Sequence, residues 1–328
     1  MPILRVVLAM GVLCIGTLFA GSGAAQAQTG YPAKPLRLVV PFPAGGTTDL
    51  LGRLVGQGMS AQLGQSVVLD NRAGAGGMLG ADLVAKAPAD GYTLILSNAA
   101  SHGVAPSIHK QMPYDAVRDF VHIGIVGLLP QLFVASRSFA PASLTEFLAE
   151  ARRSPGKISY GSAGVGSIGN FSGELFKRLA DLNLVHVPYK GTAPATVDLI
   201  ANRVQVMFQN APDAGPHIRS GTLRLLAVTS EQRLPQYPDA PSFVEQGIKL
   251  VNYTWYGVSA PAGTPGAAVA ILDKALNAVL DQPSLKARLA ELGFETRKLT
   301  PQAYQQFVRS EVQKFVDVAR KAQIAADN

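Results

Sequence analysis

Short apolar runs alternate with amphipathic stretches along the chain from residue 36 onward. The runs with the length and composition of strands are 36–41, 67–70, 93–97, 123–136, 158–160, 184–187, 204–208, 223–229 and 253–260. The stretches with the apolar periodicity of helices include 50–63, 81–87, 144–153, 171–181, 196–202, 266–280 and 301–321. This alternation predicts an α/β fold with βαβ units and parallel sheets covered by helices on both faces. Ligands of such sheets bind at the carboxyl ends of the strands.

Two of the apolar runs break this alternation and divide the chain. Residues 123–136 are unusually long for one strand, and residues 253–260 are followed by Pro and Gly. Interpreted as connectors, they predict a discontinuous first lobe of residues 31–128 plus 258–328 and a second lobe of residues 129–257.

Each predicted lobe has one glycine-rich turn between an apolar strand and a helix start. The first turn follows residues 36–40 and contains Phe42, Ala44, Gly45, Gly46, Thr47, Thr48 and Asp49. The second turn follows residues 157–160 and contains Gly161, Ser162, Gly164, Gly166, Ser167 and Asn170. A helix start leaves N–H groups unpaired and carries a partial positive charge, and glycine lets an anion approach it closely. The two turns therefore predict a pocket that holds a small carboxylate from both lobes.

Other polar residues follow neighbouring strands and are candidates for the same pocket. They are Ser97, the segment Lys190, Gly191, Thr192 and Ala193, and the loop that contains Asn210 and Asp213. Lys190 would suit a dicarboxylate or be a surface charge. Asp49 is either a structural cap of its helix or a partner for a ligand ammonium group or a bridging water. Trp255 and Tyr256 are expected in the core between the lobes, because large aromatic residues mostly serve packing.

The N-terminus indicates where the protein works. Arg5 precedes an apolar stretch at residues 6–20, and residues 25–27 match an Ala-x-Ala cleavage site, so we expect residues 1–27 to be a cleaved signal peptide. The one cysteine, Cys14, lies in that segment, which leaves the mature chain without a thiol. Arg5 is also the one charged residue there, so the formal net charge of +7 becomes about +6. We expect a periplasmic protein.

The basic residues are scattered, without the clustering and interleaved aromatics that nucleic-acid binding requires. The sequence Gly164-x-Gly166-x-x-Gly169 fits a dinucleotide fingerprint, but the acidic residue expected about twenty positions later is missing. The five histidines lack metal-ligand spacing, and Ser162 and Ser167 lack the context of a nucleophile elbow. We therefore expect no cofactor, no metal site, no catalytic residue and no nucleic-acid partner.

Several motifs, taken in order along the chain, resemble one known family. They are the segments 31–49, 71–77, 90–94, 155–167, 187–195, 226–230 and 255–265. Together they resemble the Bug/TctC proteins, which are periplasmic solute-binding components of tripartite tricarboxylate transporters. The chain departs from the usual family pattern at Ala44, at Gln209-Asn210 and at Asn170, and the last two departures concern ligand identity.

The resemblance implies a type II periplasmic-binding-protein fold, with two doubly wound lobes joined by crossing strands and a ligand cleft between them. It further implies that one strand–turn–helix unit from each lobe holds a ligand carboxylate. The expected partners are a small carboxylate solute and the integral-membrane permease subunits of a transporter, and we expect a monomer.

Two other classes of function remain open from the sequence. One is a secreted hydrolase or oxidoreductase on the same α/β scaffold, because a fold alone does not determine function. The other is a solute sensor for a signalling partner, which would have the same sequence features.

Overall fold

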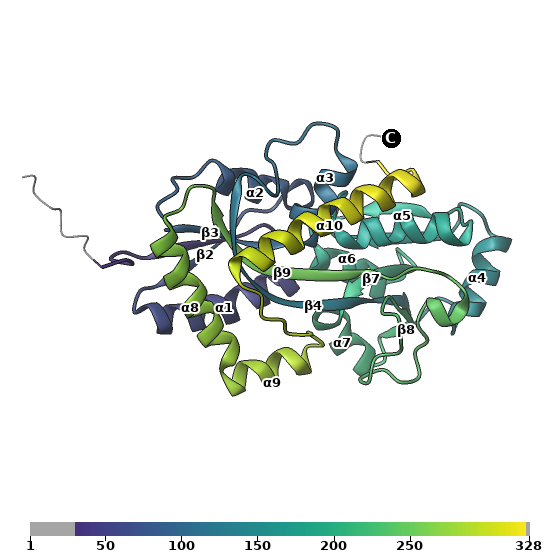
Figure 1. Cartoon of the computed structure of the whole chain (residues 1–328). Coiled ribbons are helices and arrows are strands. Elements are labelled where there is room, and N and C mark those ends of the chain that lie inside the picture. Colours follow the sequence, from purple (N-terminus) through teal and green to yellow (C-terminus); the bar gives the residue numbers. More distant parts are fainter. Residues whose placement is uncertain (1–29, 326–328) are drawn as a thin grey trace, which may run out of the picture.

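The computed structural model describes residues 30–325 and consists of one long mixed sheet flanked by helices (Figure 1). The strands are β1 (Leu36–Val40), β2 (Val67–Asn71), β3 (Thr93–Asn98), β4 (Phe120–Ser136), β5 (Ser159–Ser162), β6 (Val185–Pro188), β7 (Val206–Asn210), β8 (Leu223–Val228) and β9 (Tyr253–Pro261). The α-helices are α1 (Thr47–Leu63), α2 (Met78–Ala85), α3 (Ala105–Ile108), α4 (Leu144–Arg153), α5 (Ile168–Ala180), α6 (Thr192–Ile200), α7 (Ala211–Arg219), α8 (Gly266–Asp281), α9 (Pro283–Glu291) and α10 (Pro301–Ala322). Short helical turns are η1 (Ala75–Gly77), η2 (Ala100–Val104) and η3 (Val244–Gln246).

The sheet has two parallel parts joined by two antiparallel strands. Its order is β2-β1-β3-β9-β4-β7-β5-β6, and β8 pairs with β4. We call β2, β1 and β3 the first half-sheet, and β7, β5 and β6 the second half-sheet; within each, the strands are parallel. The strands β4 and β9 connect the half-sheets and are the crossing strands.

The long strand β4 serves both halves of the sheet. Residues up to Pro130 pair with β9, whereas Gln131 and the residues after it pair with β7 and β8. The predicted connectors at 123–136 and 253–260 are thus the two crossing strands. The predicted domain boundaries stay a prediction, although β4 changes partners two residues beyond the predicted boundary at 128/129.

Helix α10 packs across both halves of the molecule (Figure 1). It contacts α3 and β4, and its Phe315 ring lies 5.1 Å from the Phe171 ring of α5. Trp255 of β9 is fully buried beneath this helix, with its ring 5.5 Å from that of Phe307. Trp255 thus lies in the core, as expected from the sequence.

Local sequence explains where the site-bearing elements begin and end. Strand β1 is a nearly continuous apolar run, as expected for a parallel strand covered on both faces. Helix α1 begins after Gly46 and ends at Gly64, which adopts the left-handed conformation that glycine tolerates. All the expected strands are present, and α4 has the predicted bounds.

The segment from Asn210 to Asp213 is not the loop that was expected from the sequence. It is the junction of β7 and α7, because α7 begins at Ala211 and carries Pro212 in its first turn. Proline is favoured there because the first helical N–H groups have no intrahelical partner. Asp213 therefore lies in the first turn of a helix.

Candidate functional site

Four helices begin around one cavity between the two half-sheets. Residues at the N-termini of α1, α5, α6 and α7 line a cavity of about 70 Å³, together with residues of the crossing strands. Each of these helices follows a strand, namely β1, β5, β6 and β7. The cavity thus lies at the carboxyl ends of the parallel strands, the position predicted from the alternation of strands and helices.

This arrangement gives the cavity wall four partially positive helix ends without a basic side chain. Among the described residues that line it, none is Lys or Arg. The first N–H groups of a helix have no intrahelical partner, and each N-terminus carries roughly half a positive charge. Four such ends directed at one space favour an anionic group there.

Asp213 is the one carboxylate in the described lining, and it bridges the two halves of the molecule. Its Oδ1 accepts a hydrogen bond of 3.0 Å from Thr47 N, and its Oδ2 accepts one of 2.7 Å from Thr47 Oγ1. Thr47 begins α1 beside the first half-sheet, whereas Asp213 belongs to α7 beside the second. Burial raises the pKa of Asp213 to about 6, although the two hydrogen bonds from Thr47 oppose that shift.

Asn210 and Gln209 fix the neighbouring wall. Asn210 Nδ2 donates to Tyr256 Oη at 3.1 Å, and Asn210 Oδ1 accepts from Thr254 Oγ1 at 2.9 Å. Gln209 Nε2 donates to Thr196 Oγ1 at 2.7 Å, whereas the buried Gln209 Oε1 has no hydrogen-bond partner among the described residues. Asn210 is thus tied to crossing strand β9, and Gln209 offers a free acceptor.

The structure brings eleven of the predicted site residues to the cavity lining. They are Phe42, Ala44, Gly46, Thr47, Thr48, Ser167, Gly191, Thr192, Ala193, Asn210 and Asp213. The structure places the other nine outside the lining: Gly45, Asp49, Ser97, Gly161, Ser162, Gly164, Gly166, Asn170 and Lys190.

Asp49 does not line the cavity, and residues of its own half of the molecule hold its carboxylate. Its carboxylate accepts hydrogen bonds from Gly45 N, from the Arg53 guanidinium and from Asn71 Nδ2. Burial opposes ionisation, but these hydrogen bonds hold the pKa of Asp49 below its usual value. These contacts are those of a structural cap, which was one of the two interpretations of Asp49.

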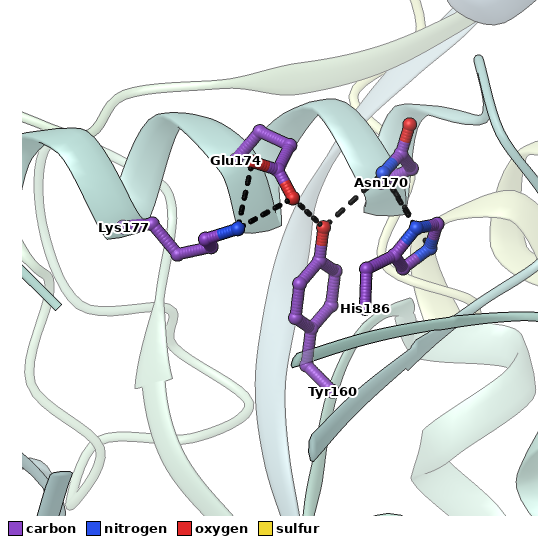
Figure 2. Close-up of polar contacts among 5 residues, drawn as sticks. All are labelled: Tyr160, Asn170, Glu174, Lys177 and His186. Atoms are coloured by element: carbon purple, nitrogen blue, oxygen red, sulfur yellow. Dashed lines mark hydrogen bonds and ion pairs between the residues drawn. The ribbon is translucent and has the colours of Figure 1, made fainter. Parts of the chain in front are cut away.

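Asn170 belongs to a polar network between α5 and the neighbouring strands (Figure 2), and Ser162 contacts the His186 of that network. Asn170 Nδ2 donates to Tyr160 Oη at 3.1 Å, and Tyr160 in turn donates to Glu174. Ser162 Oγ lies 2.7 Å from His186 Nε2, and the His186 ring stacks on Tyr160. Neither Ser162 nor His186 belongs to the described lining, so this serine–histidine pair does not face the cavity.

The remaining predicted residues outside the lining have other positions. Ser97 is fully buried and hydrogen-bonds to Ser259 and Tyr304. Lys190 is exposed and lines a second hollow beside the turns that contain Gly76 and Gly164.

Several lining residues were not among the predicted site residues, although Gln209 was noted as a departure that concerns ligand identity and Tyr256 was expected in the core. They include Asn98, Gln131, Ile168, Gly169, Gln209, Thr254 and Tyr256. Ile168 and Gly169 continue the second glycine turn into α5, so the helix start itself could have indicated them. Gln131, Thr254 and Tyr256 lie on crossing strands, whose pairing the sequence pattern does not define.

A second contact between the halves, which we call the rim contact, lies beside the cavity and outside its lining. A Cβ atom added at Gly76 would lie 2.7 Å from the carbonyl carbon of Gly166. The two backbones therefore meet in a way that only glycine permits, and this contact together with the Asp213–Thr47 bridge defines a closed cleft.

Comparisons with known proteins agree with this architecture. The periplasmic binding protein BugD superposes with a TM-score of 0.86 at 36% identity, covering 90% of this chain and 99% of BugD. The structure of R. palustris Rpa4515 with adipate superposes with a TM-score of 0.86 at 37% identity. The match covers 90% of this chain and 99% of Rpa4515. MatC from Rhodopseudomonas palustris, solved with bound malate, superposes with a TM-score of 0.84 at 33% identity. The match covers 88% of this chain and 99% of MatC.

These similarities establish the fold as that of a two-lobed periplasmic binding protein, as the resemblance implied. A sequence profile of TctC, the tripartite tricarboxylate transporter family receptor, matches residues 51–324. The chain belongs to this family, and the family resemblance inferred from its motifs is confirmed.

The rim contact predicts the effect of one added methyl group. Gly76→Ala places a Cβ against Gly166 and should keep the cleft open, seen as a larger radius of gyration by small-angle scattering. Gly64→Ala is the matched control, because Gly64 has φ 64° against 63° for Gly76 and no neighbouring atom within 4 Å. Both variants should lose about 1–2 kcal/mol of stability from backbone strain. Equal scattering curves for the two variants would contradict the closed rim.

The raised pKa of Asp213 predicts a pH-dependent stability. Between its usual pKa near 4 and about 6, the folded protein holds a proton that the unfolded chain has released. The stabilisation is therefore complete at the lower pH and is lost as the pH rises through about 6. From about pH 5 to pH 7, the parent should lose roughly 1 kcal/mol relative to Asp213→Asn.

Denaturant unfolding of both proteins at each pH measures this difference. Tyr256 also faces Asp213, but burial raises the pKa of Tyr256 so far that it stays neutral throughout. A difference in unfolding free energy that does not change with pH would contradict the burial of an ionisable Asp213.

Proposed function

We propose that this protein is a periplasmic receptor that binds a small carboxylate solute in the cavity and delivers it to the permease of a tripartite tricarboxylate transporter. One observation carries the proposal: four helix N-termini, from both halves of the molecule, surround one buried cavity whose described lining has no basic side chain. Backbone N–H groups at helix starts suit a carboxylate. Two relatives were solved with such acids, adipate and malate.

A closed cleft explains how binding could be coupled to delivery. A solute held by helix starts from both halves is fully bound only when the halves meet, so it favours the closed form. A permease could then recognise the closed shape, and we propose that the receptor acts as a monomer.

A binding role without turnover fits the contents of the cavity. The lining that the structure describes contains Ser167 and Asp213 but no histidine, and Ser167 Oγ accepts a hydrogen bond from Asn170 N as a helix cap. In residues 30–325 no group of three or more His, Cys, Asp and Glu side chains is arranged to hold a metal ion.

The proposed location rests on the family and on the N-terminal sequence. The predicted signal peptide, residues 1–27, lies outside the described residues. None of the helices described in the structure has the length and apolarity needed to span a membrane. We propose that the mature protein acts in the periplasm, and mass spectrometry of a periplasmic fraction should find a chain that starts near Gln28.

Filling the cavity should abolish binding while the fold persists. Gly46 lines the cavity with extended backbone angles, so a larger side chain introduces no backbone strain. With a carboxylate identified by thermal-shift screening, Gly46→Leu should weaken its binding at least tenfold, or about 1.4 kcal/mol. Calorimetry measures the loss.

Gly46→Ala is the control, because its Cβ would meet its nearest neighbours at an ordinary contact distance of 3.9 Å. Parent-like binding by a folded Gly46→Leu would exclude this cavity as the binding site. Conversion of the bound acid to a product by the parent would favour an enzyme over a receptor.

A further inference from the structure

We propose that Asp213 determines which carboxylates this protein accepts, and that the cavity selects a solute carrying an ammonium group besides its carboxylate. This inference rests on the proposed function and specifies the solute class of the same site.

Asp213 already occupies one anion position of the cavity. Both of its carboxylate oxygens accept hydrogen bonds from Thr47, one from the backbone N–H and one from the hydroxyl. This is the contact that a solute carboxylate would make at the start of α1. A solute carboxylate placed there would have to displace Asp213 or lie directly beside it, and two like charges at such a distance repel strongly in a buried site.

The remaining anion position lies at two other helix starts. The starts of α5 and α6 also line the cavity, through Ile168 and Gly169 in one helix and Thr192 and Ala193 in the other. Their N–H groups lie in the first turns, where no intrahelical acceptor exists. One solute carboxylate is therefore accommodated beside the second half-sheet.

The same wall contains an acceptor that has no described donor, the Oε1 atom of Gln209. Gln209 is 2% exposed, lines the cavity, and its Oε1 has no hydrogen-bond partner among the described residues. Its orientation is fixed, because Nε2 donates to Thr196 Oγ1, whose own hydrogen is donated to Thr192 O at 2.9 Å. The free atom is thus an acceptor, and a buried acceptor without a donor is costly.

The formal charges of the lining and of the solute also favour an ammonium group. Among the described lining residues, Asp213 carries the only formal charge. A dicarboxylate would add two negative charges beside it, whereas an amino acid adds a carboxylate for the helix starts and an ammonium group for Asp213 and Gln209. Ammonium has three donors and no acceptor, which matches these two acceptor groups of the cavity lining. Burial raises the pKa of Asp213, and no Lys or Arg among the described lining residues offsets that shift.

Chain-matched pairs of acids test this selection. Calorimetry would compare succinate with 3-aminopropanoate, glutarate with 4-aminobutanoate, and adipate with 5-aminopentanoate, on the full mature protein. In at least one pair, the parent should bind the amino acid at least tenfold more tightly than the matching diacid. Asp213→Asn should reduce that ratio at least tenfold, by weakening the amino acid and strengthening the diacid.

Two further variants make the result specific. Gln209→Leu removes the second acceptor, leaves Asp213 in place, and should lower the same ratio at least threefold. Asp273→Asn makes the same chemical change in a partly buried carboxylate of α8, outside the cavity lining, and should leave the ratio unchanged.

The outcomes separate this inference from the proposed function. Diacids that bind more tightly than their amino partners in every pair, or a ratio that Asp213→Asn leaves unchanged, would overturn the role of Asp213 while carboxylate binding stands. Failure of all six acids to bind would overturn both.

Discussion

Helix N-termini cannot satisfy their own first N–H groups, and four of these ends meet at one buried cavity in this protein. The rest of the site follows from that constraint. Each buried N–H group needs an acceptor, and the chain itself supplies one in Asp213, which reaches from α7 to the start of α1. The other helix starts are left for a solute.

The hydrogen bonds between Asp213 and Thr47 also connect the recognition of a solute to the closure of the cleft. Thr47 and Asp213 lie 166 residues apart and belong to opposite halves of the sheet. Their contact, and the approach of Gly76 to Gly166, exist only when the halves are together. Helix α10 packs across both halves, and the crossing strands β4 and β9 connect them, so any opening must be absorbed in these elements.

Much of this architecture could be predicted from the sequence because it depends on local patterns. The nine strands, the bounds of α4 and the first glycine turn follow from apolar periodicity and from glycine beside Thr47 and Thr48. The second turn was only partly informative. Side chains such as Asn170 and Ser162 have the residue types of a binding site, but they bond to Tyr160 and His186 of the neighbouring strands.

The role of Asp213 was beyond such reasoning. Helix α7 is short and contains two prolines, Pro212 and Pro216, so its sequence did not indicate a helix, and no local pattern links Asp213 with Thr47. The most direct test is a crystal structure with the acid that gives the largest thermal shift. A carboxylate at hydrogen-bond distance, about 2.7–3.2 Å, from N–H groups at the start of α5 or α6, with Asp213 still bonded to Thr47, is predicted. An acid bound outside the cavity, or one that displaces Asp213 from Thr47, would contradict the account.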